Sequence, residues 1–385
     1  MRILHTSDWH VGRRLGHNDR TAETREALAE VAAIADDREV DLVLVSGDIF
    51  DRPVPPVDAL SLGLGGMLRL AAGRPVVAVA GNHDSPELFD ALAPLLRERG
   101  VHVRGAVRRP EEGGLIGADE LGVPAVVAAF PFLREGRVVD FMREAGAWYG
   151  QYAEKVAGIC AAYGRALAEA AGGDRVALLV AHFMVSGVRL AHSERELHIG
   201  EAYSATSQAI PPGPQYVALG HIHAPQVVPG SPVPACYAGS LLPLDFGEAG
   251  EAKRVVIVEA EPGRLATVES VPLTAGRPLR REAGTWDELA ARTDEISGSY
   301  LELTVRLGGP DPELGHRAAD TFPYLVRVRP EYPASATAPA RDAHGERPDD
   351  LALFAAYHEA TYGAEPPEPL RRLLREVLED IDATP

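Results

Sequence analysis

Short apolar runs recur between residue 1 and about residue 275, and segments with helical periodicity separate them. Four of the runs occupy residues 42–45, 76–79, 176–180 and 216–219 and consist of Val, Leu, Ala and Tyr. Unbroken apolar runs of this length are typical of strands that are buried on both faces. Residues 253–258 indicate a late strand that closes the same unit.

Helix-like segments lie between these runs. In residues 21–38, the apolar residues Ala27, Leu28, Val31 and Ile34 recur at spacings that place them on one helix face. Residues 148–171 also have a helical pattern. The repetition of strand, helix and strand predicts an α/β layered fold.

The pattern changes after residue 275. Residues 285–288 resemble a helix start with a capping box. Residues 300–307 and 324–328 alternate like half-exposed strands. We therefore predict a main domain over residues 1–275 and a small α+β domain over residues 276–330.

The remaining sequence predicts a linker and a helical segment. Residues 331–349, rich in Pro, Ala, Asp and Arg, indicate a flexible linker. Residues 350–385 predict two short helices, and the second has an apolar stripe formed by Leu370, Leu373, Leu374, Val377, Leu378 and Ile381. The stripe could pack on the main domain, but a short amphipathic helix pair behind a flexible linker favours docking on a partner.

The composition is that of an ordinary globular protein, with 46% apolar and 24% charged residues. No apolar stretch approaches the ~20 residues needed to span a bilayer, and the start of the chain lacks a signal-peptide core. Cys160 and Cys236 are expected to be buried thiols. These features predict a cytoplasmic protein that does not associate with membranes.

The formal net charge of −18 opposes broad non-specific binding to a polyanion such as DNA. This charge is an average over the whole surface. Bound divalent cations would reverse the local potential at a carboxylate-rich site. The charge therefore does not exclude a metal-dependent enzyme that acts on DNA.

Five short polar motifs each directly follow an apolar run. They are Asp8-Trp9-His10, Gly47-Asp48-Ile49-Phe50-Asp51, Gly81-Asn82-His83-Asp84, Ala181-His182 and Gly220-His221-Ile222-His223. Motifs in these positions should lie at the carboxyl ends of strands, where the loops of an α/β sheet converge on one crevice. Carboxylate, amide and imidazole groups without thiolate suit Mn²⁺, Fe²⁺ or Zn²⁺. The number of candidate ligands indicates two ions that share a bridging carboxylate.

Each motif alone has an ordinary explanation. A single His-x-His pair is most often a surface or core feature, and Gly81-Asn82-His83-Asp84 could be a simple turn. Five coincidences in order are a poor explanation of the whole set. His182 has the weakest support, because only its place after a strand favours it. In the loop after the first motif, Arg13, Arg14, His17 and Arg20 could contact a DNA backbone or be solvated.

The combination D-x-H, G-D-x-x-D, G-N-H-D, H and G-H-x-H resembles the pattern of the calcineurin-like metallophosphoesterases. The strings at residues 5–12, 193–200, 218–223 and 237–240 resemble the SbcD family of bacterial nucleases within that superfamily. The resemblance extends over nearly the whole chain. It implies a four-layered α/β/β/α metallophosphoesterase domain, a small α+β capping domain and C-terminal helices.

The resemblance also implies roles for individual residues. One ion would bind Asp8, His10 and His223, the other would bind Asn82, His182 and His221, and Asp48 would bridge the two. His83 would be the acid or transition-state stabiliser near the leaving oxygen, with Asp84 orienting its ring. Asp51 would lie behind Asp48. The implied cofactor is a pair of Mn²⁺ ions per chain, with Mg²⁺, Fe²⁺ and Zn²⁺ as alternatives.

The implied activity is a Mn-dependent nuclease for DNA repair, recombination and replication. It would be a 3′-to-5′ exonuclease on duplex ends and an endonuclease on single strands and hairpins. The implied partners are DNA, the SbcC ATPase docked on residues 350–385, and a second copy of the chain that packs through helices at residues 57–70 and 86–99. The rival interpretations are a metallophosphodiesterase or phosphatase for a small substrate, and a non-catalytic scaffold. The sequence after residue 275 argues against the first, and the complete ligand set against the second.

Overall fold

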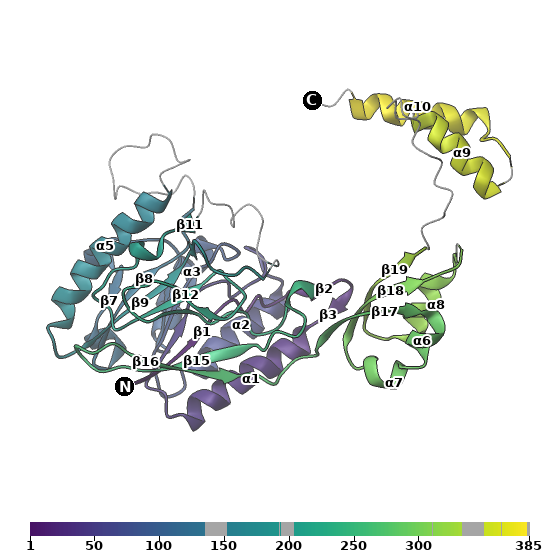
Figure 1. Ribbon diagram of the computed structural model, residues 1–385. Coiled ribbons are helices and arrows are strands. Elements are labelled where there is room, and N and C mark those ends of the chain that lie inside the picture. The colour runs from purple at the N-terminus through teal and green to yellow at the C-terminus, as the bar shows by residue number, and fades with distance from the viewer. Residues whose placement is uncertain are drawn as a thin grey trace. The chain divides into compact units, whose positions relative to one another are not determined.

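The computed structural model describes residues 1–134, 152–191, 193, 204–309, 311–332, 350–362 and 364–382 (Figure 1). The chain divides into two compact units, Met1–Glu331 and Tyr332–Pro385. No helix in the described part is long and apolar enough to cross a membrane.

One six-stranded sheet of the first unit contains the amino-terminal strand. Its order is β16-β15-β1-β4-β5-β6. The strands are β1 (Arg2–Thr6), β4 (Leu42–Val45), β5 (Val76–Val79), β6 (Val101–Arg104), β15 (Arg254–Glu259) and β16 (Thr267–Pro272). Strands β1, β4, β5 and β6 are parallel to one another, whereas β15 and β16 pair antiparallel at one side.

The second six-stranded sheet has the order β13-β14-β12-β9-β8-β7. Its strands are β7 (Leu115–Ile116), β8 (Ala125–Phe130), β9 (Val176–His182), β12 (Tyr216–Gly220), β13 (Gln226–Val227) and β14 (Ala235–Tyr237). The four central strands are parallel, and the short edge strands β7 and β13 are antiparallel to their neighbours.

Three apolar clusters join these sheets and helices into layers. The middle cluster contains residues from both sheets, such as Leu44 and Val77 from one and Val127 and Leu178 from the other. Helices α1 (Thr21–Asp37), α2 (Val57–Leu70) and α3 (Pro86–Arg97) cover the outer face of the first sheet. Helix α5 (Tyr152–Ala171) covers the second (Figure 1). The predicted α/β/β/α order is confirmed, and burial on both faces explains why the strands lack polar alternation.

Several short elements connect the layers. They are the hairpin β2 (Arg14–Leu15) and β3 (Asn18–Asp19), the pair β10 (Met184–Val185) and β11 (Ser204–Ala205), helix α4 (Ala118–Leu121), and the 3₁₀ segments η1 (Pro110–Glu112), η4 (Ser207–Ala209) and η5 (Phe246–Glu248). The β2–β3 hairpin lies in the loop that follows β1.

A three-stranded parallel sheet follows the main sheets; we call it the cap sheet. Its strands are β17 (Leu279–Thr285), β18 (Tyr300–Arg306) and β19 (Leu325–Glu331), and helices α6 (Trp286–Ala290), α7 (Thr293–Ile296) and α8 (Leu314–Thr321) accompany it. These elements share their own apolar cluster. Thr285 and Glu288 form the predicted capping box at the start of α6.

Several element predictions are confirmed, but the sequence analysis missed other strands, among them β6, β8, β14, β16 and β17. Strands β4 and β5 have the predicted bounds, and α1 ends one residue before the predicted limit. Strands β16 and β17 were not predicted, because polar residues dominate both. The predicted start of a helix at residue 148 lies outside the described residues, and α5 is described from Tyr152. Both cysteines are buried and unpaired, as expected.

The second unit contains two helices, α9 (Asp350–Tyr362) and α10 (Glu368–Asp382), which confirms the predicted helix pair. In α10, Leu370 is 40% exposed and Leu373 is 56% exposed. Most of the predicted linker, residues 333–349, lies outside the described residues.

Candidate metal centre

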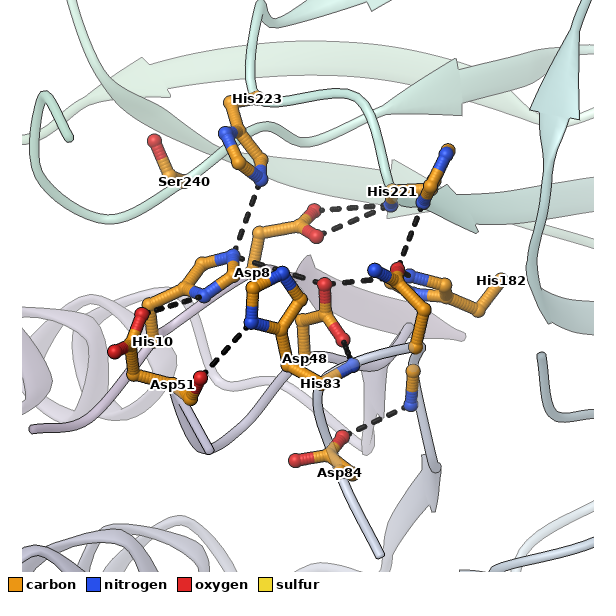
Figure 2. A network of polar contacts seen from close by, with 12 residues as sticks. Asp8, His10, Asp48, Asp51, His83, Asp84, His182, His221, His223 and Ser240 are labelled. Carbon is orange, nitrogen blue, oxygen red and sulfur yellow. Dashed lines mark hydrogen bonds and ion pairs between the residues drawn. The ribbon is translucent and has the colours of Figure 1, made fainter. Parts of the chain in front are cut away.

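The five polar motifs lie at the carboxyl ends of five parallel strands. The ends of β1, β4 and β5 are neighbours in the first sheet, and the ends of β9 and β12 are neighbours in the second. The ligand-type side chains of the five motifs point toward one another in the space where the two sheets meet (Figure 2). The sheet geometry thus brings together residues that are more than two hundred positions apart in the sequence, such as His10 and His223.

Asp8, His10, Asp48 and His223 form a first cluster. Their ligand-type atoms all lie within 4.8 Å of one another. Nε2 of His10 is 3.1 Å from Nε2 of His223 and 3.7 Å from a carboxylate oxygen of Asp48. Each of the four residues is at most 2% exposed. A divalent cation placed among these atoms would receive lone pairs from carboxylates and imidazoles, the donors it prefers.

Asn82, His182 and His221 form a second cluster on the other side of Asp48. The side-chain oxygen of Asn82 lies 3.0 Å from Nε2 of His182 and 2.9 Å from Nδ1 of His221. Oδ2 of Asp48 lies 3.5 Å from Nε2 of His182. The same Asp48 oxygen is also the one near His10. The Asp48 carboxylate is therefore located between the two clusters, as a bridging ligand would be.

The backbone around these residues is strained. Asp8, His10, Asp48 and His221 have φ values of 50°, 44°, 50° and 100°, in the region that glycine usually occupies. Such conformations cost about 1–3 kcal/mol each and persist where the surroundings fix them. Two backbone hydrogen bonds hold the first two motifs together. The Asp8 amide donates to the Gly47 carbonyl at 2.9 Å, and the His10 amide donates to the Asp48 carbonyl at 3.0 Å.

Close approach of the loops requires glycine at several positions, among them Gly81 and Gly220. A Cβ atom on Gly81 would lie 2.1 Å from a carboxylate oxygen of Asp48, and one on Gly220 would lie 2.0 Å from the Ser46 carbonyl. Both distances are far below van der Waals contact. The glycines of the third and fifth motifs therefore have a steric function at the site.

The electrostatics of the buried carboxylates fit a cation. Burial raises the pKa of Asp8 to about 7, although nearby His182 opposes the rise. Burial alone would raise the pKa of Asp48, but the adjacent His182 and His83 outweigh this effect and hold the pKa well below its usual value. A divalent cation would remove the cost of ionising Asp8 in this buried position.

His182 is held in the orientation that a ligand needs. Its Nδ1 lies 2.7 Å from the Ser46 carbonyl and donates to it, which places the lone pair on Nε2, the nitrogen that faces Asn82 and Asp48. Sequence reasoning missed the support behind Ser46. There, buried His5 lies 2.8 Å from the Ser46 hydroxyl and 2.9 Å from the Tyr216 hydroxyl. The available signal was its place at the start of the string at residues 5–12 that resembles the SbcD family.

Asp84 contacts the backbone and not the ring of His83, contrary to our expectation. Its carboxylate accepts bonds from the amides of Ile49, Phe50 and Gly81, at 3.1, 2.8 and 2.9 Å. Asp84 therefore ties the second and third motifs together.

The ring of His83 is oriented by Asp51. Nδ1 of His83 lies 2.9 Å from the Asp51 carbonyl, while the Asp51 carboxylate lies 3.7 Å from Nδ1 of His10. Asp51 was expected behind Asp48 and instead lies behind His10. It thus supports two histidines of the site at once (Figure 2).

The four residues proposed as DNA contacts separate into two groups. Arg14 and His17 are exposed and Arg13 is partly exposed, with an ion pair of 3.3 Å to Asp51. Arg20 is only 2% exposed, and it binds Glu23 and the Pro243 carbonyl. The prediction that Arg20 contacts DNA is therefore wrong, because its guanidinium is buried in the protein.

Comparison with known proteins identifies the family. A family model described as calcineurin-like phosphoesterase matches residues 1–225. The chain is 31% identical over 398 residues to the SbcD component of the SbcCD nuclease of Bacillus subtilis, and the alignment covers 99% of both chains. The chain belongs to the SbcD family of calcineurin-like phosphoesterases.

Two further SbcD relatives also align with most of this chain. The protein of the same description from Rhodobacter capsulatus is 32% identical, with 92% of this chain and 94% of the relative covered. The one from Escherichia coli is 30% identical, with 77% and 74% covered. This SbcD-family chain is a metal-dependent phosphodiesterase of the nuclease type, and its buried Asp and His cluster is suited to metal ions.

Proposed function

We propose that the chain cleaves DNA phosphodiester bonds with a pair of Mn²⁺ ions. The observation that carries the proposal is the position of Asp48 between two clusters of ligand-type side chains. The first ion would bind Asp8, His10 and His223, the second would bind Asn82, His182 and His221, and Asp48 would bridge them. When bound, such a pair supplies positive charge that polarises the phosphodiester and acidifies the attacking water.

His83 is the proposed acid for the leaving oxygen. The Asp51 carbonyl holds the proton on Nδ1, so Nε2 is the nitrogen that would deliver a proton to the departing 3′ oxygen. The His83 amide also donates to Asp48 at 2.8 Å, which ties the acid to the bridging ligand. Asp84 has no direct part in this step, and it acts through the loop that it holds.

DNA is the proposed substrate, with 3′-to-5′ exonuclease activity on duplex ends and endonuclease activity on single strands and hairpins. The long alignments with SbcD components of SbcCD nucleases support this substrate class. Exposed Arg14 and His17 and partly exposed Arg13, in the loop that follows two proposed ligands, are the proposed backbone contacts. The cations would compensate locally for the acidic net charge of the chain.

A comparison of two substrates tests this proposal. The purified chain would be given Mn²⁺ with either bis-p-nitrophenyl phosphate or linear duplex DNA labelled at one 3′ or one 5′ end. We expect hydrolysis of both, with early release of the 3′ label. Hydrolysis of the small ester alone would favour a small-substrate phosphodiesterase. If the chain hydrolyses neither substrate, with or without an SbcC-type ATPase, the interpretation as a non-catalytic scaffold would remain.

We also propose a division of the chain and two protein partners. Residues 1–275 would be the nuclease domain, residues 276–330 the capping domain, residues 331–349 a linker and residues 350–385 a docking segment for an SbcC-type ATPase. A second copy of the chain would pack on α2 and α3, where Val57 is 80% exposed and Leu95 is 65% exposed. Exposed apolar side chains on adjacent helices support such an interface.

A further inference from the structure

A buried charged network lies against the ring nitrogen of His223 that points away from His10. The Ser193 hydroxyl lies 2.6 Å from Nδ1 of His223 and donates to a carboxylate oxygen of Glu248. The Glu248 carboxylate pairs with Nζ of Lys253 at 2.5 Å. Glu248 is 2% exposed and Lys253 is 5% exposed. Lys253 also donates to the His223 carbonyl at 2.9 Å.

These hydrogen bonds fix the tautomer of the His223 imidazole, that is, which ring nitrogen carries the hydrogen. The Ser193 hydroxyl donates its hydrogen bond to Glu248, so its oxygen accepts a hydrogen bond from the Nδ1–H group of His223. The lone pair of the ring then resides on Nε2, which lies 3.1 Å from Nε2 of His10. A metal-binding histidine needs this arrangement, with one ring nitrogen held by an acceptor and the other directed at the ion.

We propose that Glu248 is a positioning residue that, through Ser193, presents Nε2 of His223 to the ion shared with Asp8 and His10. The inference rests on the proposed function, because it requires His223 to be a metal ligand. A buried ion pair is weak evidence for stability alone, since desolvation offsets much of its attraction. Glu248 and Lys253 are therefore better explained by the ring that they orient than by the stability they add.

The short turn that contains Glu248 holds its carboxylate in place. It is the last residue of η5, and the Asp245 side chain caps that turn by accepting from the Gly247 amide at 2.9 Å. Phe246, in the same turn, packs with Leu279 and Tyr300 of the cap sheet. The turn is thus clamped at one end by apolar packing, and the carboxylate at its other end reaches His223 through Ser193.

Two variants of the full chain test the role: Ser193→Ala, which removes the bridge, and Glu248→Gln, which removes the negative charge. The first readout is Mn²⁺ binding to the metal-depleted protein by titration calorimetry. We expect one of two ions to bind about 10–100-fold more weakly, the usual effect of losing an outer-shell partner, and the other to bind as before. The second readout is turnover against Mn²⁺ concentration, in which excess Mn²⁺ should restore kcat.

Glu251→Gln is the matched control. Glu251 also pairs with Lys253, at 3.1 Å, but it is joined to Arg189 on its other side and not to Ser193. We expect wild-type affinity for both ions. Unchanged Mn²⁺ affinity in Ser193→Ala and Glu248→Gln would overturn the positioning role while the nuclease proposal stands. A lowered melting temperature with equal weakening of both ions would also overturn it, as a structural role. Failure of the wild-type chain to bind two ions would instead refute the proposed function.

Discussion

Single side chains at this site have separable tasks, because some would hold ions and others would only meet the substrate. Asp48 is the side chain on which both clusters depend, since one of its oxygens lies 3.7 Å from His10 and 3.5 Å from His182. His83 donates to Asp48 through its backbone amide, and its ring lies edge-on to the ring of His10 with 4.7 Å between the ring centroids. The two residues should therefore respond differently to substitution.

Asp48→Ala is expected to remove both ions, because it deletes the ligand that the two clusters share. Loss of the central carboxylate also removes negative charge that two cations in a buried site require. Metal analysis after dialysis should give fewer than one ion per chain. Asp58→Ala, on the exposed start of α2, is the matched control and should retain two. Two retained ions in Asp48→Ala would refute the bridging role.

His83→Gln is expected to keep both ions and lose turnover. A positioned proton donor typically contributes about 10²–10⁴-fold to a rate, so kcat should fall within that range. The Gln amide cannot deliver a proton, yet its backbone amide still bonds Asp48. The measurement pairs kcat on a model phosphodiester with metal content. A parallel loss of metal would show that His83 belongs to the ligand frame.

Among the strands and loops, the sequence identified the parts that local pattern controls. Buried parallel strands read as unbroken apolar runs, so β4 and β5 could be placed from composition alone. Ligand-type residues directly after such strands could be assigned to one edge. Strand β17 was missed because its exposed face carries Arg281 and other polar side chains, which obscure the pattern.

The contacts of individual side chains could not be predicted, because they depend on which loops meet. Asp84 was assigned to the His83 ring, but the third motif lies close enough to the second for it to bind the amides of Ile49 and Phe50 instead. Arg20 looked like a surface arginine until the cap sheet covered it, with Tyr300 5.2 Å from its guanidinium. Glu248 belongs to no motif, and only the fold brings it to His223.

Gly81→Ala tests the close packing of the loops. The added methyl would lie 2.1 Å from the Asp48 carboxylate and 2.4 Å from its amide, so the loop or the ligand must move. We expect metal affinity to fall at least tenfold and the melting temperature to drop. Gly158→Ala in α5, where a methyl meets no atom within 4 Å, should be neutral or stabilising by about 0.5–1 kcal/mol. Wild-type metal binding in Gly81→Ala would contradict the steric account.

Across the chain, the proposed chemistry and the proposed docking are located in different compact units. The ligand-type clusters and His83 all belong to the unit Met1–Glu331, whereas α9 and α10 belong to the unit Tyr332–Pro385. The first unit has its own apolar clusters, and among the described residues none of these clusters includes a residue of the second unit. Hydrolysis and partner binding should therefore be separable by truncation.

Removal of residues 350–385 is expected to abolish association with an SbcC-type ATPase and to preserve hydrolysis of a model phosphodiester. Apolar side chains on α10, such as Leu370 and Leu373, would supply the contact area. Co-purification with the ATPase measures association, and Mn²⁺-dependent hydrolysis measures the site. A milder variant, Leu370→Asp with Leu373→Asp, retains residues 350–385 and should also weaken the association with the ATPase. Undiminished co-purification of the truncated chain would exclude this segment as the docking site, whereas lost hydrolysis would show that the first unit needs the second to form its metal centre.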